Sequence, residues 1–306
     1  MEDFKLSTMN LAPIVIFTYN RPIHTQQTIE ALLKNQYAKE SDLIIYSDAA
    51  YTENAKQGVI ETRQYIHSIT GFNSIRVIER EKNFGLSNNI IDGVAHIINE
   101  YGRIIVLEDD LKTSPYFLKY MNEALNMYEN EKEVISVHGY VYPLKRKLPE
   151  TFFIRGADCL GWGTWKRGWD LFVEDGQSLL NEIREKRLEK DFDFSGAYPY
   201  TKMLEKQAKG VVGSWAIRWY ASAFLKGMLT LYPSRSLIFH NGSDGSGTNS
   251  ADSDEFNVEL SMTPITLRKA AVKEDKNARN AIIHYFRYTR LKRIITSRLR
   301  KLFSKK

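Results

Sequence analysis

Five short apolar runs rich in β-branched residues recur along the first half of the chain, with stretches of helical character between them. The runs occupy residues 12–18, 43–47, 75–79, 103–108 and 134–139. This alternation is typical of a parallel sheet whose strands are connected by helices. The run Ile14-Val15-Ile16-Phe17 is apolar at consecutive positions, as required when helices cover both faces of a strand. The sequence therefore predicts an α/β fold with a mostly parallel central sheet.

Proline and serine mark where the connecting helices are expected to begin. Pro22 suits the first turn of a helix running to about Asn35, and Ser87 suits the cap of a helix running to about Tyr101. A third helix is expected after Ser114-Pro115, where apolar residues recur at helical spacing.

The second half of the chain is less regular. Residues 156–170 are rich in glycine and aromatic side chains, and a helix is expected over residues 214–228. Two short strands, 229–233 and 236–240, then precede HNGSDGSGTNS at 240–250, a composition that predicts a loop.

Composition excludes several classes of protein. Hydrophobic residues make up 43% of the chain, enough for a sizeable core and too many for a disordered protein. The single cysteine, Cys159, cannot form an internal disulfide, which fits a reducing compartment. The first ten residues include acids where a secretory signal has basic residues, and no apolar run is long enough to cross a bilayer. We expect a cytoplasmic protein.

The positive charge of the chain is concentrated at its carboxyl end. Residues 284–306 hold nine of the 43 basic residues and none of the 37 acidic ones, so the remainder is mildly acidic although the net charge is +6. Apolar residues recur at helical spacing in the same segment: Tyr288, Leu291, Ile294, Ile295, Leu299, Leu302 and Phe303. This pattern predicts an amphipathic helix that binds an anionic membrane surface. The alternatives are a solvated tail or a nucleic-acid-binding arm; with no basic patch elsewhere, no nucleic-acid partner is expected.

Three consecutive acids, Glu108-Asp109-Asp110, directly follow the apolar run RIIVL. The carboxyl end of a buried strand leads such residues to the edge where open α/β sheets bind ligands. Adjacent carboxylates suit a hard divalent cation whose other ligands are water and phosphate oxygens. An acidic helix cap is the structural alternative. The favoured prediction is a site for a metal–diphosphate complex.

The order of these motifs resembles that of the GT-A nucleotide-sugar glycosyltransferases, in particular the N-acetylglucosaminyltransferase I group and bacterial family 2-like sugar transferases. The likeness rests on FTYNRP, IIYSDA, IIVLEDDL, the following Ser-Pro and aromatic-rich helix, and Leu160-Gly161-Trp162. It extends over about residues 12–250 and implies a GT-A domain over residues 1–250. Within that domain it implies a nucleotide-sugar half at about 12–140 and an acceptor half at about 141–250. A C-terminal extension, 251–283, and the basic tail, 284–306, would follow.

The resemblance also implies roles for residues that match the family's motifs. Asp110 would ligate Mn²⁺ or Mg²⁺, and Glu108 and Asp109 would contact the donor's ribose and sugar. Asp48 would hydrogen-bond uracil, and Arg21 would reach the diphosphate, as the chemistry of a carboxylate and a guanidinium allows. A turn or cap role for Asp48 and a surface position for Arg21 remain open.

Five further positions allow either a role in the site or an ordinary structural role. Asn83 lies in a segment that lines the nucleotide in the family and that could equally be an ordinary turn. Trp162 is expected to pack on a sugar, whereas Trp165 and Trp169 are expected in the core. His240 is either an additional metal ligand or a hydrogen-bonded core histidine.

The sequence departs from the family pattern at the catalytic base. Gly213-Ser214-Trp215 stands where the N-acetylglucosaminyltransferase group has an acid before tryptophan, and serine cannot act as that base at neutral pH. Asp244 and Asp158 are the substitutes, and the stereochemical outcome stays open.

The sequence thus predicts a metal-dependent glycosyltransferase that uses a nucleoside-diphosphate sugar, with UDP favoured. Its acceptor would be a glycan, favoured as lipid-linked, in surface polysaccharide biosynthesis at the inner face of the cell membrane. A nucleotidyltransferase is one alternative, but Thr18-Tyr19-Asn20-Arg21-Pro22 is not the glycine-rich, basic phosphate loop it would need. A non-catalytic glycan-binding protein is the other.

Overall fold

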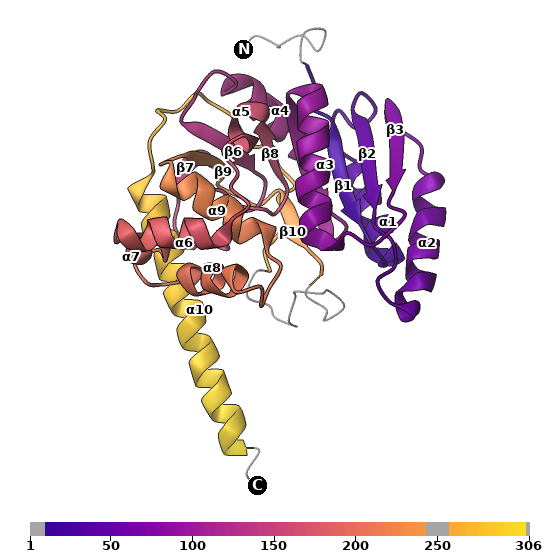
Figure 1. Cartoon of the computed structure of the whole chain (residues 1–306). Coiled ribbons are helices and arrows are strands. Elements are labelled where there is room, and N and C mark those ends of the chain that lie inside the picture. Colours follow the sequence, from indigo (N-terminus) through magenta and orange to yellow (C-terminus); the bar gives the residue numbers. More distant parts are fainter. Residues whose placement is uncertain (1–9, 243–256, 304–306) are drawn as a thin grey trace.

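An eight-stranded mixed sheet runs through the centre of the computed structural model, which describes residues 10–242 and 257–303 (Figure 1). The strand order is β3-β2-β1-β4-β8-β6-β9-β7, and β5 and β10 form a separate two-stranded sheet. The strands are β1 (Ile14–Thr18), β2 (Asp42–Ser47), β3 (Ser74–Glu79), β4 (Arg103–Glu108), β5 (Leu111–Thr113), β6 (Val134–His138), β7 (Thr151–Arg155), β8 (Trp162–Trp165), β9 (Leu229–Pro233) and β10 (Ile238–His240).

The five strands predicted from the first half are all present, as β1, β2, β3, β4 and β6. Strands β3, β2, β1 and β4 pair in parallel. The sequence analysis did not identify β8, which pairs antiparallel with both β4 and β6, or β7, which pairs antiparallel with β9. The run Trp162-Gly163-Thr164-Trp165 reads as irregular, but a side chain at Gly163 would crowd the Ile104 carbonyl, so glycine is what allows this strand to fit.

Helices cover both faces of the sheet, and consecutive strand residues enter two separate cores. Ile14 and Ile16 pack in one core, with residues of α1 and α4, while Val15 and Phe17 pack in the other, with residues of α3 and α9. The helices are α1 (Pro22–Leu32), η2 (Glu53–Ala55), α2 (Lys56–His67), α3 (Gly85–Tyr101), α4 (Phe117–Met127), α5 (Lys166–Trp169), α6 (Gly176–Glu185), α7 (Glu189–Phe192), α8 (Tyr200–Ala208), α9 (Trp215–Leu225) and α10 (Lys276–Phe303).

Helix α10 has two unlike halves. Asp275 caps it by accepting from the Asn277 and Ala278 amides, and buried residues on its first half, up to Thr289, pack on the body. Beyond that point it extends away from the body (Figure 1), so the boundary predicted at residue 284 falls inside its packed half. In the part of the chain that the structure describes, no helix is sufficiently long and apolar to cross a membrane.

Candidate active site

The acids that end β4 meet an arginine that follows β1. Because β1 and β4 are adjacent and parallel, with Phe17 opposite Glu108, the residues beyond both strands emerge at one edge of the sheet. Arg21 Nη2 donates to Asp110 Oδ2 at 2.8 Å and also to Asp109 Oδ1. Both aspartates are buried. The residues predicted to hold the metal and the diphosphate are therefore already in contact with each other.

Residues from the second half of the chain complete this cluster. Strand β10 pairs antiparallel with β5, His240 opposite Leu111, and places His240 Nε2 3.3 Å from Asp110 Oδ2. The backbone N–H of the next residue, Asn241, donates to the backbone carbonyl of Asp110 at 3.0 Å. Gly242 follows, and a Cβ atom there would lie 2.2 Å from Asp110 Oδ2. A bare backbone is thus required beside this carboxylate.

Burial and charge set the protonation of the cluster. Burial, reinforced by the neighbouring carboxylates, raises the pKa of Glu108 to about 8. Burial also raises the pKa of Asp109 to about 6, although Arg21 opposes the shift. Burial acts on Asp110 in the same direction, but hydrogen bonds and charge from His240 and Arg21 hold its pKa below the ordinary value. A site that raises two carboxyl pKa values in this way favours added positive charge.

Three buried polar atoms of the cluster have no hydrogen-bond partner among the described residues: Asp109 Oδ2, Arg21 Nη1 and Asn241 Oδ1. An unpaired carboxylate oxygen suits a cation or a hydroxyl, and an unpaired guanidinium N–H suits a phosphate oxygen. Across residues 10–242 and 257–303, however, no three His, Cys, Asp or Glu side chains converge as a full metal site. The donor set therefore fits a divalent cation only if water and a bound diphosphate supply further oxygens, the mode that Mg²⁺ commonly adopts.

Asp48 and Asn83 lie together at the end of β2, but their contacts are mainly with each other and the neighbouring backbone. The Asp48 carboxylate accepts from the Phe84 and Gly85 amides at 2.9 Å each and from Asn83 Nδ2 at 3.2 Å. The Ala49 amide, 2.9 Å away, is a fourth donor. Asp48, directly after β2, thus accepts hydrogen bonds from the backbone at the start of α3. This contact agrees with the turn or cap role that was the structural alternative for Asp48. The uracil contact remains a prediction.

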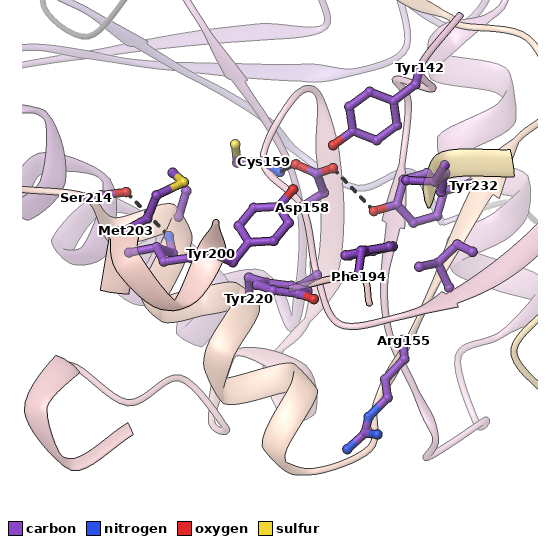
Figure 2. Close-up of a pocket in the computed structure, with 15 residues that line it drawn as sticks. Tyr142, Arg155, Asp158, Cys159, Phe194, Tyr200, Met203, Ser214, Tyr220 and Tyr232 are labelled. Carbon is purple, nitrogen blue, oxygen red and sulfur yellow. Dashed lines mark hydrogen bonds between the residues drawn. The ribbon is translucent and has the colours of Figure 1, made fainter. Parts of the chain in front are cut away.

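Asp158 lies apart from the acidic cluster, in the wall of a cavity of about 120 Å³ (Figure 2). Its carboxylate accepts from the Cys159 amide at 2.8 Å and from the Tyr232 hydroxyl at 3.3 Å. The other substitute base, Asp244, lies outside the described residues. Ser214, at the position where the related group has an acid, caps α9 and also lines the cavity.

One short loop, residues 158–161, separates the cavity from the acidic cluster. The Leu160 amide donates to His138 Nε2 at 3.0 Å, and a Cβ at Gly161 would clash with Ile238, two residues before the cluster's His240. Cys159 also lines the cavity; burial raises the pKa of its thiol, and the charges of Asp158, Glu108 and Asp110 add to that shift. The cavity and the cluster are therefore neighbours.

The structure does not place Trp162 at the acidic cluster or in the wall of the cavity. Its side chain is fully buried, with ring centroids 5.4 to 5.8 Å from those of Trp169, Trp215 and Trp219. A ring enclosed in this way has no face available to a sugar, so the expected sugar contact is corrected to core packing. Trp165 and Trp169 are also buried, as expected.

One comparison with known proteins covers the segment that holds most of this site. Residues 14–165 match the sequence model of the family described as glycosyl transferase family 2. That segment contains the whole of the Arg21 and Glu108-Asp109-Asp110 arrangement. None of the curated protein sequences compared with the chain matches it.

Several solved structures show distant similarity to this fold. TarS from S. aureus is 13% identical with a TM-score of 0.41, over 83% of this chain and 41% of that one. Its fragment 1–349 is 10% identical with a TM-score of 0.40, over 75% and 60%. The mannosyltransferase PcManGT from Pyrobaculum calidifontis, solved with GDP-Man and Mn²⁺, is 10% identical with a TM-score of 0.32, over 44% and 36%. The chain thus spans less than two thirds of each of them.

Proposed function

We propose that this chain, a glycosyltransferase with a GT-A fold, transfers a sugar from a nucleoside-diphosphate donor, in the first instance UDP, to a glycan acceptor. The observation that carries the proposal is the cluster of two buried aspartates, Asp109 and Asp110, with partly buried Arg21 and His240 at the carboxyl edge of the sheet. The cluster combines carboxylates, an imidazole and a guanidinium. A carboxylate oxygen of Asp109 and a guanidinium nitrogen of Arg21 have no hydrogen-bond partner among the described residues, so they can bind a cation and a phosphate oxygen, respectively.

The donor's diphosphate would take over the guanidinium. In the structure Arg21 uses its Nη2 hydrogens on Asp109 and Asp110 and leaves Nη1 unpaired among the described residues. A diphosphate would accept from both nitrogens of the fork, which frees the aspartates for other ligands. Asp110 and His240 would then hold Mn²⁺ or Mg²⁺, and Glu108 and Asp109 would accept from ribose and sugar hydroxyls. When bound, the cation would supply charge neutralisation to the departing nucleoside diphosphate.

Asp158 is the described residue best placed to act as base. It would accept the proton of the acceptor hydroxyl as that oxygen forms its bond to the donor's anomeric carbon and the bond to the diphosphate breaks. The hydrogen bonds from Tyr232 and the Cys159 amide fix its carboxylate in the cavity wall. Asp244 stays as the alternative base.

The exposed half of α10 supports a membrane-associated acceptor. Leu291, Ile294 and Ile295 are each at least 42% exposed, and Lys292 and Arg293 lie between them. Such a basic helix with an open apolar face suits the headgroup region of an anionic membrane. An enzyme held there would act on a lipid-linked glycan from the cytoplasmic side, in the synthesis of a surface polysaccharide.

The proposal is tested by release of free nucleoside diphosphate from UDP-sugars and GDP-sugars, with and without Mn²⁺, in the presence of a glycolipid extract as acceptor source. Metal-dependent release of UDP supports the proposal. A nucleotidyltransferase would instead release pyrophosphate from a nucleoside triphosphate and a sugar phosphate. A glycan-binding protein without activity would release neither, and either of these results would overturn the proposal.

A further inference from the structure

Three consecutive basic residues, Lys145-Arg146-Lys147, lie on the loop between β6 and β7. All three are exposed, whereas Leu144 and Leu148 on either side are partly buried and pack against the core. The loop is thus anchored at both ends and presents its basic side chains to the surroundings.

The protein does not neutralise these three charges. Among the described residues, none of the three side chains is paired with an acid. The first acid after the loop, Glu150, is instead held by Arg235 through hydrogen bonds of 2.9 and 3.0 Å. Adjacent cations without counter-charges repel one another, so the loop favours an anionic partner.

The basic loop borders the exposed half of α10. The Lys145 ammonium lies over the ring of Tyr288, 5.9 Å from its centroid. Tyr288 is 60% exposed and begins an apolar stripe with Leu291 and Ile295, which follow at intervals of three and four residues and so share its side of the helix. The three basic residues of the body and the apolar stripe of α10 therefore form one continuous surface.

Helix α10 adds further positive charge around the stripe, from the exposed residues Arg287, Arg290, Lys292 and Arg293. Basic residues around an exposed apolar stripe suit an anionic membrane, where the charges meet lipid headgroups and the apolar side chains enter the interface. A nucleic acid would match the charge but would leave the stripe exposed to water. The sequence assigned the positive surface to the tail alone, and the fold adds the loop to it.

This surface lies at the edge of the sheet that holds the acidic cluster. Strands β4 and β6 are both antiparallel to β8, and Val106 and His138 both lie opposite Trp162. The two strands therefore end at the same edge, so the loop after β6 leaves the sheet on the side where Asp109 and Asp110 follow β4. The exposed half of α10 also extends from the end of the body opposite to the start of β1 (Figure 1).

From these observations we infer that the loop of residues 145–147 and the apolar stripe of α10 together lie on anionic lipid headgroups and turn the edge with the acidic cluster toward the membrane. The inference rests on the membrane-associated acceptor of the proposed function and adds a contact made by the body itself. A helix alone would tether the enzyme at variable angles, whereas a second contact on the body fixes its orientation. The donor site would then face the headgroup of a lipid-linked acceptor.

The test is co-sedimentation of the full chain, without nucleotide or metal, with liposomes of phosphatidylcholine alone or mixed with phosphatidylglycerol. The triple variant Lys145→Gln, Arg146→Gln, Lys147→Gln should bind the anionic liposomes at least about tenfold more weakly than the wild type, because each basic residue at such a surface adds to the attraction. The difference should shrink at about 1 M salt, where charges are screened beyond about 3 Å.

The matched control is the triple variant Lys34→Gln, Lys39→Gln, Lys132→Gln, which removes the same charge from exposed positions at the opposite edge of the sheet. Lys34 and Lys39 lie between α1 and the start of β2, and Lys132 lies just before β6. This control should bind like the wild type, and a thermal melt checks that both variants fold.

Orientation is tested by hydrogen exchange of the wild-type protein on the anionic liposomes. Exchange of the amides of residues 144–148 should slow, and that of residues 36–40 should not. The inference is overturned if the loop variant sediments like the control, if the loop amides exchange as in the free protein, or if the chain binds RNA of random sequence but not the liposomes. No donor is present, so these results are independent of whether UDP release is observed.

Discussion

His240 Nε2 lies 3.3 Å from Asp110 Oδ2, so the acidic motif of the first half of the chain is completed by a residue from the second half. The contact follows from the pairing of β10 with β5, which runs back along the segment directly after the motif. Arg21 reaches the same oxygen at 2.8 Å. Asp110 is thereby positioned by two basic side chains.

Gly242→Ala should damage the site without a large loss of stability. Its Cβ would lie 2.2 Å from Asp110 Oδ2, so the carboxylate or the backbone must move. We expect kcat/KM with Mn²⁺ to fall at least about tenfold, since catalytic geometry tolerates little displacement. Gly213→Ala is the matched control, because a Cβ added there would have no described atom within 4 Å beyond its chain neighbours. Equal activity of the two variants would show that the Asp110 position is not critical.

Asp48→Ala should lower the free energy of unfolding by about 1–3 kcal/mol, because it leaves partly buried amide donors without an acceptor. Urea denaturation measures this change, and titration with UDP measures any effect on the nucleotide. An unchanged stability together with a large loss of UDP affinity would assign Asp48 to reading the base instead.

The contrast between Asp48 and Trp162 shows what the sequence could and could not predict. Strand runs such as residues 103–108 are recognisable because both faces are apolar, and the end of each run locates the edge where Arg21, Asp48 and Asp110 gather. The partner of a side chain at that edge depends on loops that carry no periodic signal. Trp162 belongs to a strand interrupted by glycine, so its burial among other tryptophans becomes visible only in the fold.

Metal-free protein should lose stability as pH rises, through Glu108. Its pKa is raised from 4.5 to about 8 on folding, so between these values the native state binds more protons than the unfolded state and stability falls with increasing pH. Glu108→Gln should remove this loss of stability. In EDTA, the melting temperature of the variant should exceed that of the wild type by more at pH 8 than at pH 5. An advantage that does not depend on pH would contradict the assigned pKa.

Membrane binding should depend on the apolar face of α10 beyond its packed half. Leu291→Glu with Ile295→Glu should reduce co-sedimentation with anionic liposomes at least about tenfold, because it replaces apolar contacts with repelling charge. Ile60→Glu with Met262→Glu adds the same charge at exposed positions elsewhere and should bind normally. Deletion from residue 284 is less suitable, since it removes buried Phe286. Equal sedimentation of the two double variants would exclude the anchor.

The metal–diphosphate role of the acidic cluster is tested most directly by turnover of Asp110→Asn as a function of Mn²⁺ concentration, beside a thermal melt. The variant keeps the shape of the side chain and loses its charge, so the fold should persist while turnover falls by about 10³-fold, or about 4 kcal/mol of transition-state stabilisation. Asp170→Asn, at an exposed position directly after α5, should behave as wild type. Near-normal, Mn²⁺-dependent turnover by Asp110→Asn would contradict the central claim.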